Sequence, residues 1–367
     1  MAKICLHLLL LLLLPHLHLL SLVKADVAAI FIFGDSTMDV GTNTYLNGSV
    51  VRADRPFNGI DFPFSEPTGR FSNGYNTADL LVRLLSENYK RSPPPFLSLL
   101  RHNSTFKRKL LLGANFASGG SGILNTTGKV FVEVVSLGDQ IQQFSTAVAN
   151  ITELLGQDKA AALISSNSLY IISVGSNDIF EYQRNASNVS NEAFLSTLHD
   201  EYLSHLKNLY NLGARKFGII SAPAIGCCPY ERYLNQLYNN GSGGCYDEMN
   251  DLAQSFYNLT EIILQEFSSQ CSGVVYSLGN AYQATMDAIN NPLPFGLKDV
   301  QTPCCTSGTF TDLGLCTQSD NLCRNREDYL FWDWYHPTQH ASQLAALTLY
   351  GAAPPFVTPV NFSQLVL

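Results

Sequence analysis

Short apolar runs alternate with longer amphipathic stretches over most of this chain. Five runs rich in branched and aromatic residues are typical of buried parallel strands, at positions 27–33, 111–116, 169–174, 217–221 and 274–278. Apolar residues recur with helical spacing in five other stretches, at positions 77–88, 139–155, 194–212, 249–267 and 338–350. Because strands that alternate with helices form βαβ units, the pattern predicts an α/β fold with helices on both faces of a parallel sheet.

Three segments rich in proline, glycine and polar residues interrupt this pattern, at positions 50–73, 92–109 and 291–322. We interpret them as long surface loops rather than linkers, since the alternation of strands and helices resumes after each. Loops over the carboxyl ends of a parallel sheet usually form the substrate site. We therefore predict a single domain over residues 26–367.

The first 25 residues have the features of a secretory signal peptide. Lys3 precedes a leucine-rich run at 8–20, and small residues lead to a plausible cleavage site after Ala25. A membrane anchor is the alternative, but a proline and two histidines interrupt the run, so it would span a bilayer poorly. We expect a secreted, extracellular protein, with the cell wall as one open location and no membrane-spanning segment after cleavage.

Composition excludes some classes of partner. The chain is 46% hydrophobic and 14% charged, which suits a large core and argues against disorder. The net charge is −8 and lysine and arginine do not cluster, so nucleic acid is not an expected partner.

Eight of the nine cysteines follow the predicted signal peptide: Cys227, Cys228, Cys245, Cys271, Cys304, Cys305, Cys316 and Cys323. An even number in a secreted chain predicts disulfides, with the connectivity left open. A zinc site is the alternative, but no Cys-x-x-Cys pair is present and no histidine lies at ligand spacing. We therefore expect no metal. Nine Asn-x-Ser/Thr sequons make a glycoprotein plausible, at Asn47, Asn103, Asn125, Asn150, Asn185, Asn188, Asn240, Asn258 and Asn361.

Ser36 is the first candidate for chemistry. It follows a buried strand and Gly34, so it should lie on the turn at the carboxyl end of that strand, near a helix N-terminus that favours negative charge. The alternative is that Ser36 only caps the next helix. The G-x-S-x-G motif of the common α/β-hydrolases is absent.

Asp333 and His336 are the second candidates, three residues apart on a turn that ends at Pro337. A serine hydroxyl is a weak nucleophile and needs a base, and imidazole titrates near the working pH. A carboxylate usually holds the tautomer of that imidazole and stabilises its cation. The alternative is an ordinary loop histidine beside a capping aspartate. His340 is the nearest rival, and we expect it to point away.

Two turns follow the second and third strands, at 113–122 and 175–178, and contain glycines and an asparagine with its side-chain amide. A tetrahedral acyl intermediate carries an oxyanion, which backbone N–H groups and the Asn177 amide would stabilise. Taken alone, each segment is as well explained by ordinary turn chemistry. Ser36, the turn with Asp333 and His336, and these two glycine-bearing turns all lie after strands or in a terminal turn. We therefore expect them to converge on one edge of the sheet.

Four blocks, in order, resemble the plant GDSL esterase/lipase family within the SGNH hydrolases. They are Phe-Gly-Asp-Ser at 33–36, Gly-Ala-Asn-Phe-Ala-Ser-Gly-Gly at 113–120, Gly-Ser-Asn-Asp at 175–178 and Asp-x-x-His-Pro at 333–337. The resemblance covers essentially the whole chain after the signal peptide. One departure is Thr42, where the family usually has asparagine.

The resemblance implies a three-layer α/β/α, flavodoxin-like fold that hydrolyses carboxylic esters without a cofactor or metal. It implies Ser36 as nucleophile, His336 as base and Asp333 as the residue that orients it. The oxyanion hole would combine the Ser36 N–H, a glycine N–H and Asn177. The family's Ser-Gly step favours Gly119, whereas an offset of one residue favours Gly120.

Two other functions stay open from the sequence. An extracellular acyltransferase would use the same site but pass the acyl group to a lipid or sugar hydroxyl. A non-catalytic binding protein on this fold is the second alternative. The ester itself, whether lipid, acylated small molecule or cell-wall polymer, is not readable.

Overall fold

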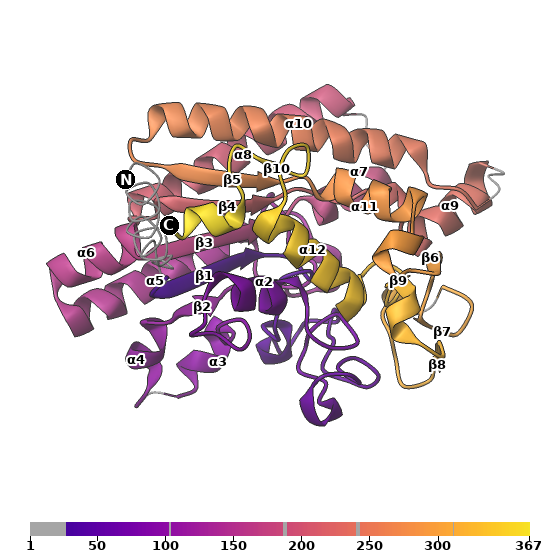
Figure 1. Ribbon diagram of the computed structural model, residues 1–367, viewed down its shortest axis with the longest axis horizontal. Coiled ribbons are helices and arrows are strands. Elements are labelled where there is room, and N and C mark those ends of the chain that lie inside the picture. Colours follow the sequence, from indigo (N-terminus) through magenta and orange to yellow (C-terminus); the bar gives the residue numbers. More distant parts are fainter. Residues whose placement is uncertain (1–26, 103, 186–188, 240–242, 311) are drawn as a thin grey trace, which may run out of the picture.

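The computed structural model describes residues 27–102, 104–185, 189–239, 243–310 and 312–367 (Figure 1). The predicted signal peptide, residues 1–25, therefore lies outside the described residues. The main sheet has six strands in the order β10–β5–β4–β3–β1–β2. Their bounds are Ala29–Gly34 (β1), Gly113–Asn115 (β2), Ser168–Ser173 (β3), Lys216–Ile220 (β4), Val275–Gly279 (β5) and Val357–Thr358 (β10).

Neighbouring strands from β1 to β5 are parallel, and β10 is antiparallel to β5. The order 2-1-3-4-5 is that of flavodoxin-like sheets, in which ligands bind outside the carboxyl ends where the order reverses. Here that point lies between β1 and β3. The five predicted strands and the predicted α/β fold are confirmed.

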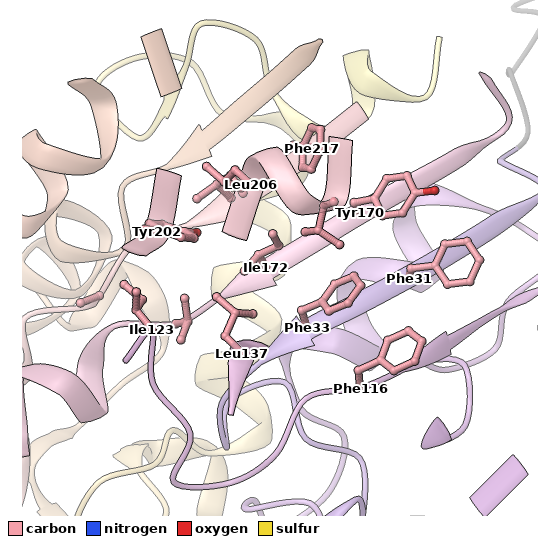
Figure 2. Packing of buried hydrophobic residues seen from close by; sticks show 14 of the residues in the cluster. Phe31, Phe33, Phe116, Ile123, Leu137, Tyr170, Ile172, Tyr202, Leu206 and Phe217 are labelled. Atoms are coloured by element: carbon pink, nitrogen blue, oxygen red, sulfur yellow. The ribbon is translucent and has the colours of Figure 1, made fainter. Parts of the chain in front are cut away.

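Side chains alternate across the buried strands and fill two cores. Phe31 and Phe33 of β1 pack with Tyr170 and Ile172 of β3 on one face, as Figure 2 shows. Ile30 and Ile32 of β1 belong to the second core. Because both faces are covered, the strands read as continuous apolar runs rather than as alternating patterns.

Helices cover both faces of the sheet, in the predicted three layers (Figure 1). Side chains of α5 (Leu137–Leu155), α8 (Asn191–Asn211) and α10 (Asp247–Gln270) fill the first core. Those of α2 (Thr77–Leu85), α12 (Gln339–Gly351) and α13 (Phe362–Leu365) fill the second.

Several elements were not predicted from the sequence. Four helices join the predicted ones: α6 (Gln157–Ser166), α7 (Ser176–Arg184), α9 (Pro229–Asn239) and α11 (Ala281–Asn290). The predicted loop at 92–109 contains the helical turns α3 (Phe96–Leu100) and α4 (Phe106–Leu110). The predicted loop at 291–322 contains strands β6 (Asp299–Pro303), β7 (Cys305–Thr306) and β8 (Asn321–Leu322); β6 pairs with β9 (Tyr329–Phe331) and β7 with β8.

Six cysteines form disulfides: Cys227–Cys245, Cys304–Cys323 and Cys305–Cys316. The predicted disulfides are confirmed for these six, whereas Cys228 and Cys271 are buried free thiols. Within the part of the chain that the structure describes, no helix is both long enough and apolar enough to span a bilayer. The assignment of residues 26–367 to one domain stays a prediction.

Candidate active site

Ser36 lies on a tight turn at the carboxyl end of β1. The turn is held by the N–H of Asp35, which donates to Ser173 O of β3, and by the N–H of Met38, which donates to Asp35 O. No α-helix begins directly after Ser36, so Ser36 is not a helix cap. The helix that starts at this edge of the sheet is α7, which follows β3 and carries Asn177 in its first turn.

The imidazole of His336 joins Ser36 to Asp333 in one hydrogen-bonded line. Its Nε2 lies 2.8 Å from Ser36 Oγ, and its Nδ1 lies 2.9 Å from both carboxylate oxygens of Asp333. Because a carboxylate only accepts, Nδ1 carries the proton and Nε2 is left to accept from the hydroxyl. All three side chains are buried, although the residues are 300 apart in sequence.

The turn that carries Asp333 and His336 has its own support. Asp333 Oδ1 accepts the backbone N–H groups of Tyr335 and His336 at 2.9 and 2.8 Å, which fixes the carboxylate. Trp332 is fully buried among the disulfide cysteines of the 304–323 segment, and its Nε1 donates to Asn58 Oδ1. Of the three aromatic residues at 332, 334 and 335, Tyr335 lines the cavity described below and Trp332 is core.

Three N–H donors face the same cavity as the Ser36 hydroxyl. Among the described residues, the backbone N–H groups of Ser36 and Gly120 have no hydrogen-bond partner. The Asn177 amide nitrogen donates one proton to Ser121 O at 2.9 Å and has a second proton to offer. The N–H of Gly119, by contrast, donates to Asp39 Oδ2 at 2.9 Å and is not available.

Gln140 is a supporting residue that the sequence analysis did not single out. This fully buried side chain of α5 accepts the N–H of Gly34 at 2.8 Å and donates to Gly34 O at 2.9 Å. It thereby fixes both backbone groups of the residue at which β1 ends. A signal was present in the sequence, because Gln140 lies on the apolar stripe of its helix with Phe144, Ala147 and Ile151.

Buried carboxylates hold the loops around this site. Burial raises the pKa of Asp39 to about 6, although four backbone N–H groups oppose the shift. Burial also raises the pKa of Asp178 to about 6, against bonds from the N–H groups of Ile123 and Leu124. The pKa of Asp35 is raised by burial as well, with hydrogen bonds from Thr37 and the charge of His336 acting against it.

A cavity of about 350 Å³ opens beside Ser36 and His336, within the size range of small-ligand sites. Its lining is mainly apolar and comes from loops after β1, β3 and β4 and from helices α7, α11 and α12. His340, the rival candidate, does not line this cavity, and its Nε2 lies 2.8 Å from Phe295 O. The buried His205 does not line it either, and its Nε2 lies 3.0 Å from Ile123 O.

One cluster in the described part of the chain has the residue types of a metal site: Cys305, Cys316 and Asp320. The two sulfurs are joined in a disulfide, so they offer no thiolate to a metal. This donor set does not fit a metal centre.

A flavodoxin-like sheet with a serine–histidine–aspartate line at its carboxyl edge defines the class as an SGNH-type hydrolase fold. The family model of the GDSL-like lipase/acylhydrolases matches residues 30–349. In Arabidopsis thaliana, GDSL esterase/lipase At4g28780 is 35% identical over 92% of this chain and 90% of its own length. GDSL esterase/lipase At3g50400 is 37% identical over 92% of this chain and 91% of its own length. GDSL esterase/lipase LTL1 is 34% identical, again over 92% of this chain and 91% of its own length.

The chain therefore belongs to the GDSL-like lipase/acylhydrolase family, and the protein is an ester-hydrolysing enzyme. The expected family and reaction class are confirmed. A solved GDSL-like lipase from Parabacteroides merdae covers 88% of this chain and 93% of its own, at 10% identity and a TM-score of 0.37. That similarity is too weak to add to the description of the fold.

Proposed function

We propose that this enzyme hydrolyses carboxylic esters through an acyl-enzyme on Ser36. His336 Nε2 takes the hydroxyl proton while Ser36 Oγ forms a bond to the ester carbonyl carbon. The tetrahedral intermediate then breaks its bond to the alcohol oxygen, which leaves with the proton from His336. Water, deprotonated by the same imidazole, attacks the acyl-enzyme, and the acid is released with Ser36 regenerated. Asp333 orients the imidazole and stabilises its cation.

The observation that carries this proposal is the 2.8 Å approach of His336 Nε2 to Ser36 Oγ, with Asp333 behind the ring. We assign the oxyanion hole to the N–H groups of Ser36 and Gly120 and to the Asn177 amide. Free donors beside the nucleophile support this choice, because unpaired buried N–H groups are costly unless a ligand uses them. The choice of Gly120 over Gly119 follows from the bond of Gly119 to Asp39.

We also propose that the protein is secreted and glycosylated. Three disulfides support an oxidising compartment. Exposed sequons supply four candidate sites: Asn47, Asn125, Asn185 and Asn258. Asn150 and Asn361 are half-buried and their amides bond to backbone oxygens, which disfavours both, and Asn103, Asn188 and Asn240 lie outside the described residues.

Covalent labelling tests the assignment of the nucleophile. A fluorophosphonate probe should modify Ser36, identified by peptide mass spectrometry, and the Ser36→Ala protein should show no label. The same substitution should lower kcat on p-nitrophenyl esters by about four to six orders of magnitude. Ser166→Ala, which removes an exposed hydroxyl at the end of α6, is the matched control. Label on another serine, or turnover that survives Ser36→Ala, would overturn the proposal.

A further inference from the structure

The cavity beside Ser36 has two unlike sides. One side is formed by large rings that pack on each other, since Tyr230 lies 4.8 Å from Phe310 and 4.9 Å from Tyr335 between ring centres. The other side lies between α11 and α12, which are neighbours in the structure (Figure 1). We call this second part the α11–α12 slot.

Small side chains form the walls of the α11–α12 slot. Ala281 and Ala284 face the cavity from α11, and Ala341 and Ala345 face it from α12. Alanines at these helical spacings leave room between the two helices instead of closing the interface. The cavity beside Ser36 is therefore open at this end partly because the side chains at these four positions are small.

Apolar side chains close the inner end of the slot. Ile220 at the end of β4, Leu349 of α12 and Phe356 line the cavity and belong to, or pack against, the second core. Leu349 lies so close to Gly279 that a Cβ there would approach it to 2.1 Å. A bound group that enters beside Ser36 would thus end against a packed hydrophobic floor.

Most polar side chains of the slot are already engaged with the protein. Ser221 Oγ accepts the N–H of Ala281 at 3.1 Å, Thr348 Oγ1 donates to its own helix, and Asn280 Oδ1 accepts an N–H of α11. The exception is Thr285 of α11, whose hydroxyl has no hydrogen-bond partner among the described residues. The charged residues of the cavity lining lie outside the slot: Asp35 and His336 beside Ser36, and Arg184 on α7. A sugar in the slot would leave most of its hydroxyls unpaired, whereas an alkyl chain would only lose contact with water.

We propose that the α11–α12 slot is an acyl-binding subsite, and that the substrates are fatty acyl esters rather than acetyl esters. This inference rests on the proposed acyl-enzyme at Ser36, from which the alkyl chain extends between the two helices. Each methylene that enters the slot should raise kcat/KM about threefold to fourfold until the slot is full.

Chain-length profiles of two wall variants and a control test the subsite. Hydrolysis of p-nitrophenyl acetate, hexanoate and laurate is measured for the wild type, Ala284→Phe, Ala345→Phe and Gln343→Phe. Gln343 lies on the exposed face of α12, so its variant adds the same ring outside the cavity. We expect the ratio of hexanoate to acetate kcat/KM to fall at least about tenfold in both wall variants, because a ring that excludes about two methylenes removes a factor of about three to four for each. The control should keep the wild-type ratio.

Binding to an inactive protein separates this proposal from the catalytic one. Laurate binding is measured by calorimetry for Ser36→Ala and for Ser36→Ala with Ala345→Phe. If Ser36→Ala binds laurate and adding Ala345→Phe abolishes that binding, the slot is supported. Should the wild type nevertheless hydrolyse no ester, only the proposed function fails. Ser36-dependent hydrolysis with acetate as the best substrate, or wall variants with the wild-type ratio, overturns the slot and leaves the proposed function standing.

Discussion

The backbone N–H of Gly119 donates to the carboxylate of Asp39, 80 residues earlier in the chain, at 2.9 Å. The other carboxylate oxygen accepts the N–H groups of Gly41 and Thr42, each at 2.7 Å. One fully buried side chain thereby joins the loop that follows Ser36 to the loop that presents the neighbouring Gly120. We infer that Asp39 sets the distance between Ser36, the proposed nucleophile, and one donor of the proposed oxyanion hole.

Replacing Asp39 by asparagine should disturb both stability and turnover. In either orientation the amide places an N–H group against a backbone N–H, which leaves a buried donor unpaired. We expect the free energy of unfolding to fall by about 1–3 kcal/mol and kcat to fall by about tenfold to a hundredfold. Chemical denaturation and p-nitrophenyl ester kinetics measure the two effects. Asp54→Asn is the control, because Asp54 pairs with Arg52 near the surface and should cost no more than about 1 kcal/mol.

Asn177→Ala should lower kcat by about 10²- to 10³-fold and change KM little. The reason is that its free amide proton is expected to bond the oxyanion, whose charge develops in the transition state and is absent from the bound ester. Steady-state kinetics on a soluble ester give both constants, and thermal unfolding checks that the bond to Ser121 is not the main loss. A raised KM with unchanged kcat would instead mean that Asn177 binds the ester equally well in the ground state and in the transition state.

Gln140→Leu should destabilise the protein because it removes one hydrogen bond from each of the two backbone groups of Gly34. The Gly34 carbonyl keeps a bond from Ser121 Oγ at 2.7 Å, but its N–H is left buried and unpaired. We expect a loss of about 2–4 kcal/mol, and a lower kcat as β1 ends less rigidly below Ser36. Gln142→Leu on the exposed face of the same helix should stay within about 0.5 kcal/mol of wild type. Similar losses in the two variants would rule out this role.

Several of the elements that the sequence predicted have a strong local pattern. Strands such as β1 are continuous apolar runs because both faces are buried, and α5 and α10 have clear apolar stripes. The helix α11 was not among the predicted elements; among its residues only Ala288 is buried, and its cavity-facing residues are small. The small sheets at 299–331 depend on two disulfides that no local pattern specifies.

The candidate site likewise has parts that the sequence predicted and parts that only the folded chain shows. Motif resemblance brought Ser36, Asp333 and His336 together, although no local property links positions 300 residues apart. The choice between Gly119 and Gly120 needed the bond to Asp39, which only the folded chain makes. The disulfide pairing could not be predicted from the sequence either. Cys227 and Cys228 are adjacent, and only the directions of their side chains in the fold decide which one is bridged.

Glu231 of α9 and Gln183 of α7 form a buried pair whose hydrogen bonding depends on a proton. Gln183 Nε2 donates to Glu231 Oε2 at 3.0 Å, while the remaining oxygen of each side chain is buried without a partner among the described residues. Burial raises the pKa of Glu231 to about 7, with the bond from Gln183 and the charge of Arg184 acting against it. A protonated Glu231 would have an O–H to offer to the unpaired Gln183 oxygen.

The sign of the pH effect follows from that raised pKa. Below about pH 4.5 Glu231 is protonated in both the folded and unfolded chain, and its contribution to stability is complete. As the pH rises through about 7, the folded protein must lose a proton that it binds more tightly than the unfolded chain does. The contribution of Glu231 is then lost, so this residue should lower the free energy of unfolding between about pH 4.5 and 7.

Glu231→Gln should remove this pH dependence, because an amide presents the N–H donor at every pH. We expect the variant to exceed wild type by about 1–3 kcal/mol at pH 8 and to match it near pH 4.5. Urea denaturation at both pH values gives the comparison, and subtracting wild type cancels the other buried carboxyls. Glu248→Gln, an exposed position at the start of α10, should show no such crossover. A variant less stable than wild type at pH 8 would mean that the Glu231 carboxylate is stabilised in place, with Arg184 as its counter-charge.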